Sequence, residues 1–512
     1  MFGGRVAVVG AGVGGLVAAS LLAARGISVV VIERSAGFGG KMRSVEIAGR
    51  HVDCGPTVFT MRPVFEDIFA AAGSTLADHL TLRPAKVLAR HAWSEVERLD
   101  LFADIDRSAD AIGRFAGLQE AKGYVEFCAR ARRIYESLEA PFIQSARPSL
   151  HGLVGAFGLR RLGDLWQISP FVNLWNALSD HFRDPRLRQL FGRYATYCGS
   201  SPFSAPATLM LVAHVEREGV WLVDGGMYRL AQALAALAAR AGAVLRYQSE
   251  ASAIIVKRGR ACGVALASGE RIDADAVIFN ADTAALSSGQ FGKAVAAAAP
   301  RRPSASRSLS AITWAMVAPA DGFPLVRHNV FFSSDYADEF DRIRRGKLPR
   351  EPTVYVCAQD RGDVDGHLAN SATSAEALFC LVNAPPTGGA HSLEIPEINQ
   401  CEERTFALLR RCGLRIEQRS TTTVMTTPHD FERLFPATGG ALYGPASHGW
   451  MASFRRPGSR SRIPGLYLAG GSTHPGPGVP MAAISGRLAA EAVAEDFASM
   501  RRLLPADMSG GT

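Results

Sequence analysis

The clearest pattern of apolar and polar positions lies at the start of the chain. Val6 to Val9 form a short apolar run typical of a buried parallel strand, and an Ala/Leu-rich stretch then continues as a helix to Gly26. A second apolar run, ISVVVIE, ends at Glu33. Strand, helix and strand in immediate succession predict a βαβ unit, and therefore an α/β fold built on a parallel sheet.

The turn between the first strand and the helix is rich in glycine. Gly10, Gly12 and Gly15 follow the GxGxxG spacing, with Gly14 between the last two. In such a turn the first glycine permits the sharp bend, the second lets the backbone approach a pyrophosphate, and the third lets helix pack on strand. The helix N-terminus adds amide donors and the positive end of its dipole. Together these features predict a dinucleotide site.

Acidic and basic residues follow this unit at informative positions. Glu33 ends the second strand, where a carboxylate accepts the ribose hydroxyls of an adenosine, and Arg34 beside it either contacts the nucleotide or is solvated. The next loop, GGKMRS, contains Gly40, Lys41 and Arg43. We expect this loop to cross the cofactor with its two cations near the phosphates, although a plain surface turn is the alternative. A second glycine pair at this point is typical of flavoproteins rather than NAD enzymes.

Composition narrows the class of protein. A chain of 512 residues with 47% hydrophobic and 20% charged residues forms a well-cored protein of more than one domain. The net charge of +8 invites a nucleic-acid or anionic-membrane partner, but no dense basic tail or RNA-binding motif accompanies it, so nucleic acid is not expected. Eight scattered cysteines without a Cys-x-x-Cys pair predict reduced thiols and no metal site. No apolar run is long and uninterrupted enough to span a membrane, which predicts a cytoplasmic or one-sidedly attached protein.

Two further motifs bring a family resemblance. DCGPTVFT begins at Asp53 and YLAGGSTHPGPGVP ends at Pro480. With the N-terminal unit they resemble the bacterial phytoene desaturase family, FAD-dependent carotenoid desaturases among the amine oxidase-like flavoproteins, and the likeness extends over nearly the whole chain. The resemblance implies a Rossmann-like FAD-binding domain, of the amine oxidase and glutathione reductase type, with an inserted α+β substrate domain. FPATGGALYGPASHGWMASFRRPGS and THPGPGVPMAAISGRLAAE resemble the 1-hydroxycarotenoid 3,4-desaturase subgroup in particular.

The resemblance also implies which residues hold FAD. The middle block, including a GGM turn, should place Ala251 against the adenine, and the loop Asn280 to Asp282 should close near the cofactor. A helix from Ala482 should point its N-terminus at the polar edge of the flavin. The other implied contacts are Gly55, Pro56 and Thr57, Gly470 and Gly471 at the ribityl chain and phosphate, and Val479, Pro480 and Met481 at the isoalloxazine ring.

The same resemblance divides the chain into alternating segments. The FAD-binding parts are 1–84, 220–300 and 436–497, and 498–512 is a tail that frays from Ala506. The segment 85–219 is expected to be helical and to contribute substrate and membrane contacts. The segment 301–435 is expected to supply a sheet from AITWAMVA, HNVFFSS, PTVYVCAQ and ALFCLVNAPP, followed by a helix from Glu394 to Cys412.

The implied reaction removes two hydrogens from the 3,4 single bond of an acyclic 1-hydroxycarotenoid, with hydride passing to the flavin and a proton leaving from carbon 3. The protein then mainly positions the substrate and excludes water. His474, in the loop beside the flavin, is the candidate proton acceptor, and a hydrogen bond to the loop backbone is its alternative role. Selectivity for the hydroxyl requires a hydrogen-bonding group in an apolar tunnel, which no motif identifies.

The expected partners follow from so apolar a substrate. It is collected from lipid, which predicts a protein peripheral to the cytoplasmic side of the inner or photosynthetic membrane, with oxygen or a quinone as electron acceptor. The stretch from His151 to Phe182 either lies at the bilayer interface or covers the pocket as core helices. The alternatives are a general phytoene or neurosporene desaturase, a carotene isomerase, or a non-catalytic prenyl-lipid escort of the same fold.

Overall fold

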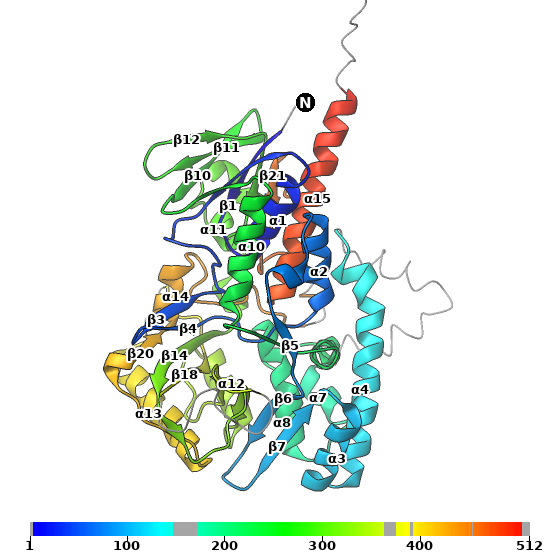
Figure 1. Cartoon of the computed structure of the whole chain (residues 1–512), viewed down its shortest axis with the longest axis vertical. Coiled ribbons are helices and arrows are strands. Elements are labelled where there is room, and N and C mark those ends of the chain that lie inside the picture. The colour runs from blue at the N-terminus through cyan, green and yellow to red at the C-terminus, as the bar shows by residue number, and fades with distance from the viewer. Residues whose placement is uncertain are drawn as a thin grey trace, which may run out of the picture.

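The computed structural model describes residues 4–146, 172–362, 375–389, 393–449, 451–452 and 454–503. Figure 1 shows two main bodies along the long axis, one around β1, α1 and α15 and the other around β14, β18 and α4. Most of the expected membrane-facing stretch His151 to Phe182, and all of the tail from Ala506, lie outside the described residues.

The first body is built on a parallel sheet of five strands in the order β21-β13-β1-β2-β9. These strands come from three distant parts of the sequence: β1 (Arg5–Val9), β2 (Ser28–Ile32), β9 (Val244–Arg246), β13 (Ala276–Phe279) and β21 (Leu466–Leu468). Because β1 lies at the centre, the glycine-rich turn after it opens at the carboxyl edge of the sheet, where such sheets bind ligands.

Side chains on β1 alternate between two layers. Val6 and Val8 pack against helices α1 (Val13–Ala23), α10 (Tyr228–Arg240) and α15 (Val479–Leu503). Ala7 and Val9 face the opposite layer, an antiparallel sheet of β10 (Ala251–Lys257), β11 (Arg260–Leu266) and β12 (Arg271–Asp273). This alternation with a period of two is what a strand buried on both faces requires.

The C-terminal helix α15 begins earlier than the sequence suggested. We expected it from Ala482, but it starts at Val479 and runs to Leu503, because proline at the second position fits the first turn of a helix. It crosses α1 at very close range. A Cβ on Gly486 would lie 2.1 Å from the carbonyl oxygen of Gly14, so the two helices approach backbone to backbone.

The second body contains a mixed sheet of seven strands in the order β20-β14-β18-β17-β16-β6-β7. Its strands are β6 (Val87–Ala92), β7 (Arg98–Phe102), β14 (Ser310–Ala318), β16 (His328–Phe331), β17 (Val354–Ala358), β18 (Glu376–Ala384) and β20 (Thr423–Thr426). The four expected runs after residue 301 all contribute, and α13 (Ile395–Arg411) occupies the expected helix. The expectation that 85–219 is helical was incomplete. β6 and β7 form a hairpin that joins this sheet through parallel pairing of β6 with β16.

The two faces of this sheet have different roles. On one face Trp314, Met316 and Cys380 pack against α13. The other face carries residues such as Thr313, Tyr355 and Phe379, which line a cavity. Helices cover that cavity from the opposite side: α4 (Leu118–Leu138), α8 (Pro185–Gly192), the 3₁₀ turns η4 (Arg193–Cys198) and η5 (Ala207–Met210), and α9 (Leu211–Arg217).

Shorter elements complete the fold. They are β3 (Ser44–Ile47), β4 (Arg50–Asp53), α2 (Arg62–Ala71), η1 (Leu76–Asp78), β5 (Leu82–Pro84), α3 (Ile105–Ala116), η2 (Glu139–Ile143), α7 (Leu174–Leu178), β8 (Trp221–Val223), α11 (Thr283–Ser287), η6 (Lys293–Ala298), η7 (Ser304–Ser306), β15 (Ala320–Asp321), α12 (Tyr336–Arg344), β19 (Arg415–Ile416), η8 (Ser420–Thr422) and α14 (Pro428–Leu434).

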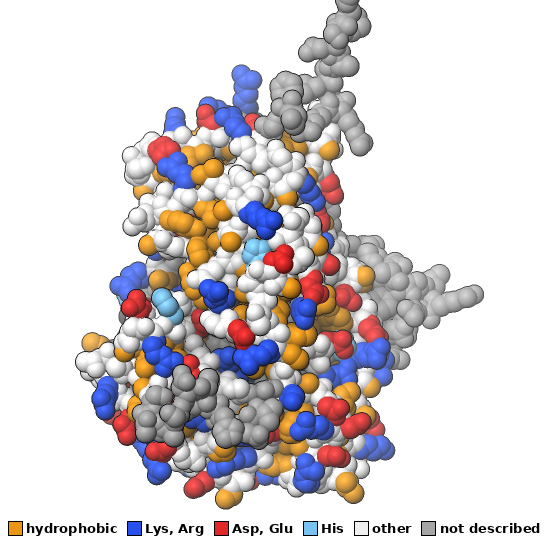
Figure 2. All heavy atoms as spheres, viewed as in Figure 1, with side chains coloured by type: hydrophobic (Ala, Val, Ile, Leu, Met, Phe, Trp, Pro, Cys, Tyr) orange, Lys and Arg blue, Asp and Glu red, His pale blue; other side chains and the backbone are white. Residues whose placement is uncertain are grey.

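Surface and thiols add little chemistry of their own. On the face shown in Figure 2, basic and acidic side chains are interspersed rather than gathered into a single stripe. All eight cysteines are unpaired, and burial raises the pKa of thiols such as Cys357 to about 11. Among the helices of the described residues, none has the length and apolarity to cross a bilayer.

Candidate active site

One large cavity runs between the two bodies of the molecule. Its volume of about 1350 Å³ exceeds that of ordinary small-molecule sites, which hold roughly 300–1,000 Å³. Residues from the glycine-rich turn, from the C-terminal loop and from the seven-stranded sheet all line it. The cavity therefore has room for a dinucleotide and a second molecule beside it.

The glycine-rich turn borders this cavity as the sequence predicted. Gly10, Gly12 and Gly14 line it, whereas Gly15 does not. A Cβ on Gly15 would lie 2.2 Å from the carbonyl oxygen of Gly10, so its role is close packing of helix on strand. No side chain of the described residues caps the N-terminus of α1. The first amides of that helix thus remain as donors for an anionic ligand.

Glu33 is held by the turn itself. Its Oε2 accepts a hydrogen bond of 2.8 Å from the Ala11 amide and its Oε1 accepts one of 2.8 Å from the Ser35 amide. The carboxylate lines the cavity and keeps acceptor capacity for ribose hydroxyls. Arg34 also lines the cavity, but its guanidinium donates to the carbonyl oxygen of Arg433. Ala251, at the start of β10, lines the same end.

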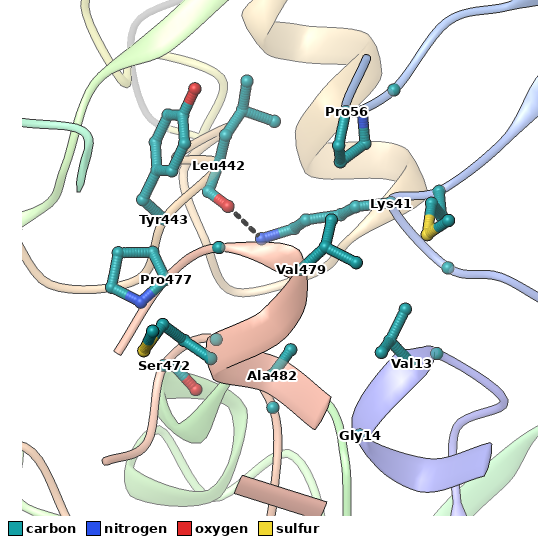
Figure 3. A pocket seen from close by; sticks show the side chains of 18 of the residues that line it. Val13, Gly14, Lys41, Pro56, Leu442, Tyr443, Ser472, Pro477, Val479 and Ala482 are labelled. Atoms are coloured by element: carbon teal, nitrogen blue, oxygen red, sulfur yellow. Dashed lines mark hydrogen bonds between the residues drawn. The ribbon is translucent and has the colours of Figure 1, made fainter. Parts of the chain in front are cut away.

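The loop after the ribose acid crosses the cavity, and its cations have protein partners. Lys41 is partly buried and donates to the carbonyl oxygen of Leu442 at 2.5 Å. Figure 3 shows this side chain passing between Pro56 and Val479. Burial lowers the pKa of Lys41, and the charge of Asp282 partly opposes the shift.

Arg43 and the glycines around it fix the loop. Arg43 donates to the Thr426 hydroxyl at 3.0 Å, and Gly40 has a φ of 60°, in the left-handed region. A Cβ on Gly55 would lie 2.1 Å from the carbonyl oxygen of Lys41. Both cations line the cavity, so their expected contact with phosphates stays a prediction.

The segment from Gly55 to Thr57 borders the cavity next to this loop. Asp53 just before it accepts hydrogen bonds from the amides of Met227 and Tyr228, at 2.5 and 3.4 Å. Burial raises the pKa of this carboxyl, while these amides lower it. Asp53 therefore fastens the segment to the turn before α10.

The C-terminal loop meets the same cavity from the other side. Gly470, Gly471, Val479, Pro480 and Met481 all line it. Because α15 begins at Val479, its N-terminal dipole points into the cavity beside that of α1. This arrangement favours the negative charge of a bound ligand at two places, one at the start of α1 and one at the start of α15.

Arg456 holds this loop, and sequence reasoning missed it. Its buried guanidinium donates to the carbonyl oxygens of Gly471 at 3.2 Å, Tyr443 at 3.4 Å and Pro445 at 2.6 Å. Burial lowers the pKa of Arg456 to about 10, so it stays charged at neutral pH. The dense run of glycine, proline and arginine around it gave no separate signal for this role.

His474 is not among the residues that line the cavity. It is 2% exposed, and its Nε2 lies 2.9 Å from the carbonyl oxygen of Phe142. The Phe142 ring packs edge-on against the imidazole. This is a contact with backbone, as in the alternative role, although the carbonyl belongs to η2 rather than to the loop itself.

We expect a His474→Gln variant to keep converting substrate and to change the acid stability of the protein. Burial lowers the pKa of His474 from 6.5 to about 4, so the unfolded chain takes up this proton at a higher pH than the folded protein. The contribution of His474 to the free energy of unfolding is therefore complete above pH 6.5 and lost as the pH falls toward 4. Between these values the wild type should lose about 1.4 kcal/mol per pH unit more than the variant.

Denaturant unfolding at several pH values measures this slope. Equal slopes in both proteins would contradict the buried, neutral state of His474. A variant that folds and binds flavin but no longer converts substrate would instead restore His474 as a proton acceptor.

The remaining part of the cavity is largely apolar. Phe142, Leu209, Val212, Val215 and Phe379 line it from the helices and from the seven-stranded sheet. A few polar groups interrupt this surface, and they escaped the sequence analysis because they belong to no motif: Arg193, Tyr197, Glu216, Thr313 and Tyr355.

The residues of the cavity part formed by the glycine-rich turn and the C-terminal loop fit FAD; this part is the cofactor half, and the apolar part is the substrate half. The uncapped N-terminus of α1, the N-terminus of α15, a ribose-type carboxylate and closely packed glycines that a Cβ would obstruct meet at one end of the cavity. These are the groups that a dinucleotide with two phosphates and an adenosine requires.

Comparison with known proteins gives the class. Residues 13–494 match the family described as flavin containing amine oxidoreductase. The chain belongs to this family, and it is an FAD-dependent oxidoreductase. Hydroxyneurosporene desaturase of Rubrivivax gelatinosus is 58% identical over 99% of this chain and 96% of its own length. The protein of the same name from Cereibacter sphaeroides is 44% identical over 97% and 99%.

Solved structures show the same fold at low sequence identity. An oxidoreductase from Methanosarcina mazei aligns with a TM-score of 0.60 at 15% identity, covering 96% of this chain and 100% of its own. Putrescine oxidase aligns with a TM-score of 0.58 at 15% identity, covering 97% and 99%. Together with the family match, these likenesses confirm the predicted fold class, cofactor and family resemblance.

Proposed function

We propose that the protein is a carotenoid desaturase that introduces the 3,4 double bond into acyclic 1-hydroxycarotenoids. The observation that carries the proposal is the continuity of one cavity, which joins a dinucleotide site to a long apolar space. A slender hydrocarbon in the apolar part would share this cavity with a bound FAD. The names of the two hydroxyneurosporene desaturases, similar along their whole length, support this substrate class.

The residues of the chain contribute binding, orientation and exclusion of water. FAD, when bound, supplies the acceptor for the hydride. Phe142, Leu209 and Phe379 hold the polyene by apolar contact and keep water from it. The N-terminus of α15 favours negative charge at the polar edge of the ring system. With the polyene spreading positive charge after hydride loss, the proton on the neighbouring carbon needs only a weak acceptor.

The proposed partners are a membrane surface and an electron acceptor, oxygen or a quinone, on the cytoplasmic side. The substrate dissolves in lipid rather than water, so it has to be collected from a bilayer. Leu118 and Val125 on α4 are exposed and lie seven positions apart, on one face of that helix. Lys122 lies between them and Arg132 seven positions beyond Val125, and each forms an ion pair with the glutamate four positions further on. Two exposed apolar side chains on one helical face suit insertion into a lipid interface.

The test uses the purified protein with FAD and liposomes that contain either a 1-hydroxycarotenoid or phytoene, under oxygen and with a quinone. We expect a red-shifted product from the hydroxylated carotenoid alone, measured by chromatography and absorption. Conversion of phytoene would move the protein to the general desaturases. A flavin-loaded protein that converts neither substrate would overturn the carotenoid proposal.

A further inference from the structure

A polar cluster interrupts the apolar part of the cavity. Arg193 and Tyr197 on η4 and Glu216 on α9 all line the cavity. The guanidinium of Arg193 donates to the Tyr197 hydroxyl at 3.0 Å, and that hydroxyl lies 3.5 Å from Glu216 Oε1. Tyr194, which does not line the cavity, donates to Glu216 Oε2 at 2.6 Å. Tyr197 therefore stands between a cation and a carboxylate.

Burying this cluster lowers the stability of the fold, compared with an entirely apolar cavity wall. Leu211, Val212 and Val215 line the cavity from the same helix as Glu216, α9. Burial raises the pKa of the Glu216 carboxyl, against the Tyr194 hydrogen bond and the charge of Arg193. Charged groups buried in apolar surroundings lower stability relative to packed hydrophobic residues. Their presence in the wall is explained when they bind a polar group of the ligand.

The cluster has unused hydrogen-bonding capacity. A guanidinium has five N–H donors, and the described residues accept one hydrogen bond from Arg193, at Tyr197. Within the described part of the chain, Glu216 Oε1 has only the long contact of 3.5 Å with the Tyr197 hydroxyl. The other carboxylates of the described lining, Glu33, Glu250 and Asp282, belong to the nucleotide-binding half.

The cluster also lies close to the cofactor half. The Arg193 guanidinium is 5.3 Å from the ring centre of Tyr355, whose hydroxyl lies 2.7 Å from Thr57 Oγ1. Thr57 follows Pro56, which Figure 3 shows beside Lys41 and Val479 at the start of α15. A continuous chain of contacts thus joins Arg193 to the segment that borders the flavin region.

The proposed substrate requires a polar contact at this short range. Its hydroxyl is on carbon 1 and the reacting bond joins carbons 3 and 4, so three bonds of about 1.5 Å separate carbon 1 from carbon 4. Whatever binds the hydroxyl must therefore lie near the cofactor and not at the remote end of the polyene. An alcohol is both donor and acceptor, which matches a guanidinium next to a carboxylate.

We propose that Arg193, Tyr197 and Glu216 form the subsite that binds the substrate hydroxyl. The alcohol oxygen accepts a hydrogen bond from the Arg193 guanidinium, and the alcohol O–H donates a hydrogen bond to Glu216 Oε1. Tyr197, which contacts both side chains, holds Arg193 and Glu216 in position. This inference rests on the proposed function and names the specificity-determining residues of that reaction. It assigns them substrate selectivity, with the chemical step left to the cofactor and the polyene.

The test measures kcat/KM for 1-hydroxyneurosporene and for neurosporene, the same polyene without the hydroxyl, with full-length flavin-loaded protein. Tyr197→Phe keeps the aromatic ring and should lower the preference for the hydroxylated substrate about tenfold. Arg193→Gln should lower it about a hundredfold, with rates on neurosporene unchanged or higher. Flavin absorbance and the thermal midpoint establish that each variant is folded.

Two matched variants separate binding from indirect effects. Tyr194→Phe removes the other phenol on Glu216 without touching the cavity, and it should leave the preference unchanged. Thr313→Val removes a buried cavity-lining hydroxyl that has no hydrogen-bond partner among the described residues, and it too should leave the preference unchanged.

Each outcome decides the assignment. A preference that falls in Tyr197→Phe and Arg193→Gln but not in the two matched variants supports the subsite. An unchanged preference in folded Tyr197→Phe and Arg193→Gln, an equal loss in Tyr194→Phe, or a loss confined to Thr313→Val overturns it. If the wild type itself fails to convert 1-hydroxyneurosporene, the proposed function falls, which is a different result.

Discussion

A Gly486→Ala variant should purify without flavin and with a free energy of unfolding lower by about 3 kcal/mol. The added Cβ would lie 2.1 Å from the carbonyl oxygen of Gly14 and 2.9 Å from its carbonyl carbon. Both atoms are backbone, so no side chain can turn aside and α15 must move away from α1. Because the N-termini of both helices border the cavity, this movement separates the two positive ends that hold the cofactor. The ratio of flavin to protein absorbance and denaturant unfolding measure the two effects.

Gly113→Ala is the matched control. Gly113 also lies inside a helix, α3, but a Cβ there would meet Ala121 at 3.5 Å, an ordinary contact. Alanine restricts the unfolded chain more than glycine, so the free energy of unfolding of this variant should be higher by about 0.5–1 kcal/mol. Its flavin content should equal that of the wild type. A Gly486→Ala protein with wild-type flavin content and stability would show that the helices can separate without consequence.

The cofactor half could be predicted because a nucleotide is bound largely by backbone groups, and the glycines that shape this backbone are visible in the sequence. Gly10, Gly12 and Gly15 are spaced by the requirements of a tight turn and a helix crossing, and that spacing is local in the sequence. The ribose-binding role of Glu33 was predicted from its position at the end of the second strand. Residues far apart, such as Ala251 and Met481, came from family resemblance, and the structure brings both to the cavity.

The protein partners of the side-chain cations could not be predicted, while their expected contact with phosphates stays a prediction. Sequence reasoning placed Lys41 and Arg43 toward phosphates because cations near a nucleotide loop often bind them. In the structure Lys41 reaches the carbonyl oxygen of Leu442 and Arg43 reaches Thr426. Leu442 lies 401 positions further along the chain than Lys41, so no local pattern could indicate it.

The polar subsite in the substrate half had no local signal either. Arg193 and Tyr197 stand four positions apart in the stretch RYATYC, which resembles any amphipathic turn. These two residues become recognisable as a subsite because Arg193 packs on Tyr355 of β17 and because apolar residues line the cavity around them. Both features arise from tertiary packing and cannot be seen in the local sequence. The hairpin of β6 and β7 was missed for a related reason, since β6 joins the sheet by pairing with the distant strand β16.

Arg456→Met should cost about 3–5 kcal/mol of stability and most of the bound flavin. Methionine fills a similar volume but donates no hydrogen bond. The carbonyl oxygens of Gly471, Tyr443 and Pro445 then lose a buried donor, and each unsatisfied acceptor costs about 1–3 kcal/mol. The free energy of unfolding and the flavin dissociation constant measure these losses.

The neighbouring residue supplies the control, since Arg455 is exposed and Arg455→Met should leave stability and flavin content unchanged. Arg456→Lys keeps the charge but not the planar fork of donors, so it should recover only part of the loss. Full recovery by lysine would mean that charge alone acts, through attraction to the reduced flavin. Wild-type behaviour of Arg456→Met would mean that the loop after β21 is held by its own turns. We expect neither result, because Arg456 connects the segment before β21 to the loop after it. The geometry of its donors, more than their charge, keeps the start of α15 directed into the cavity.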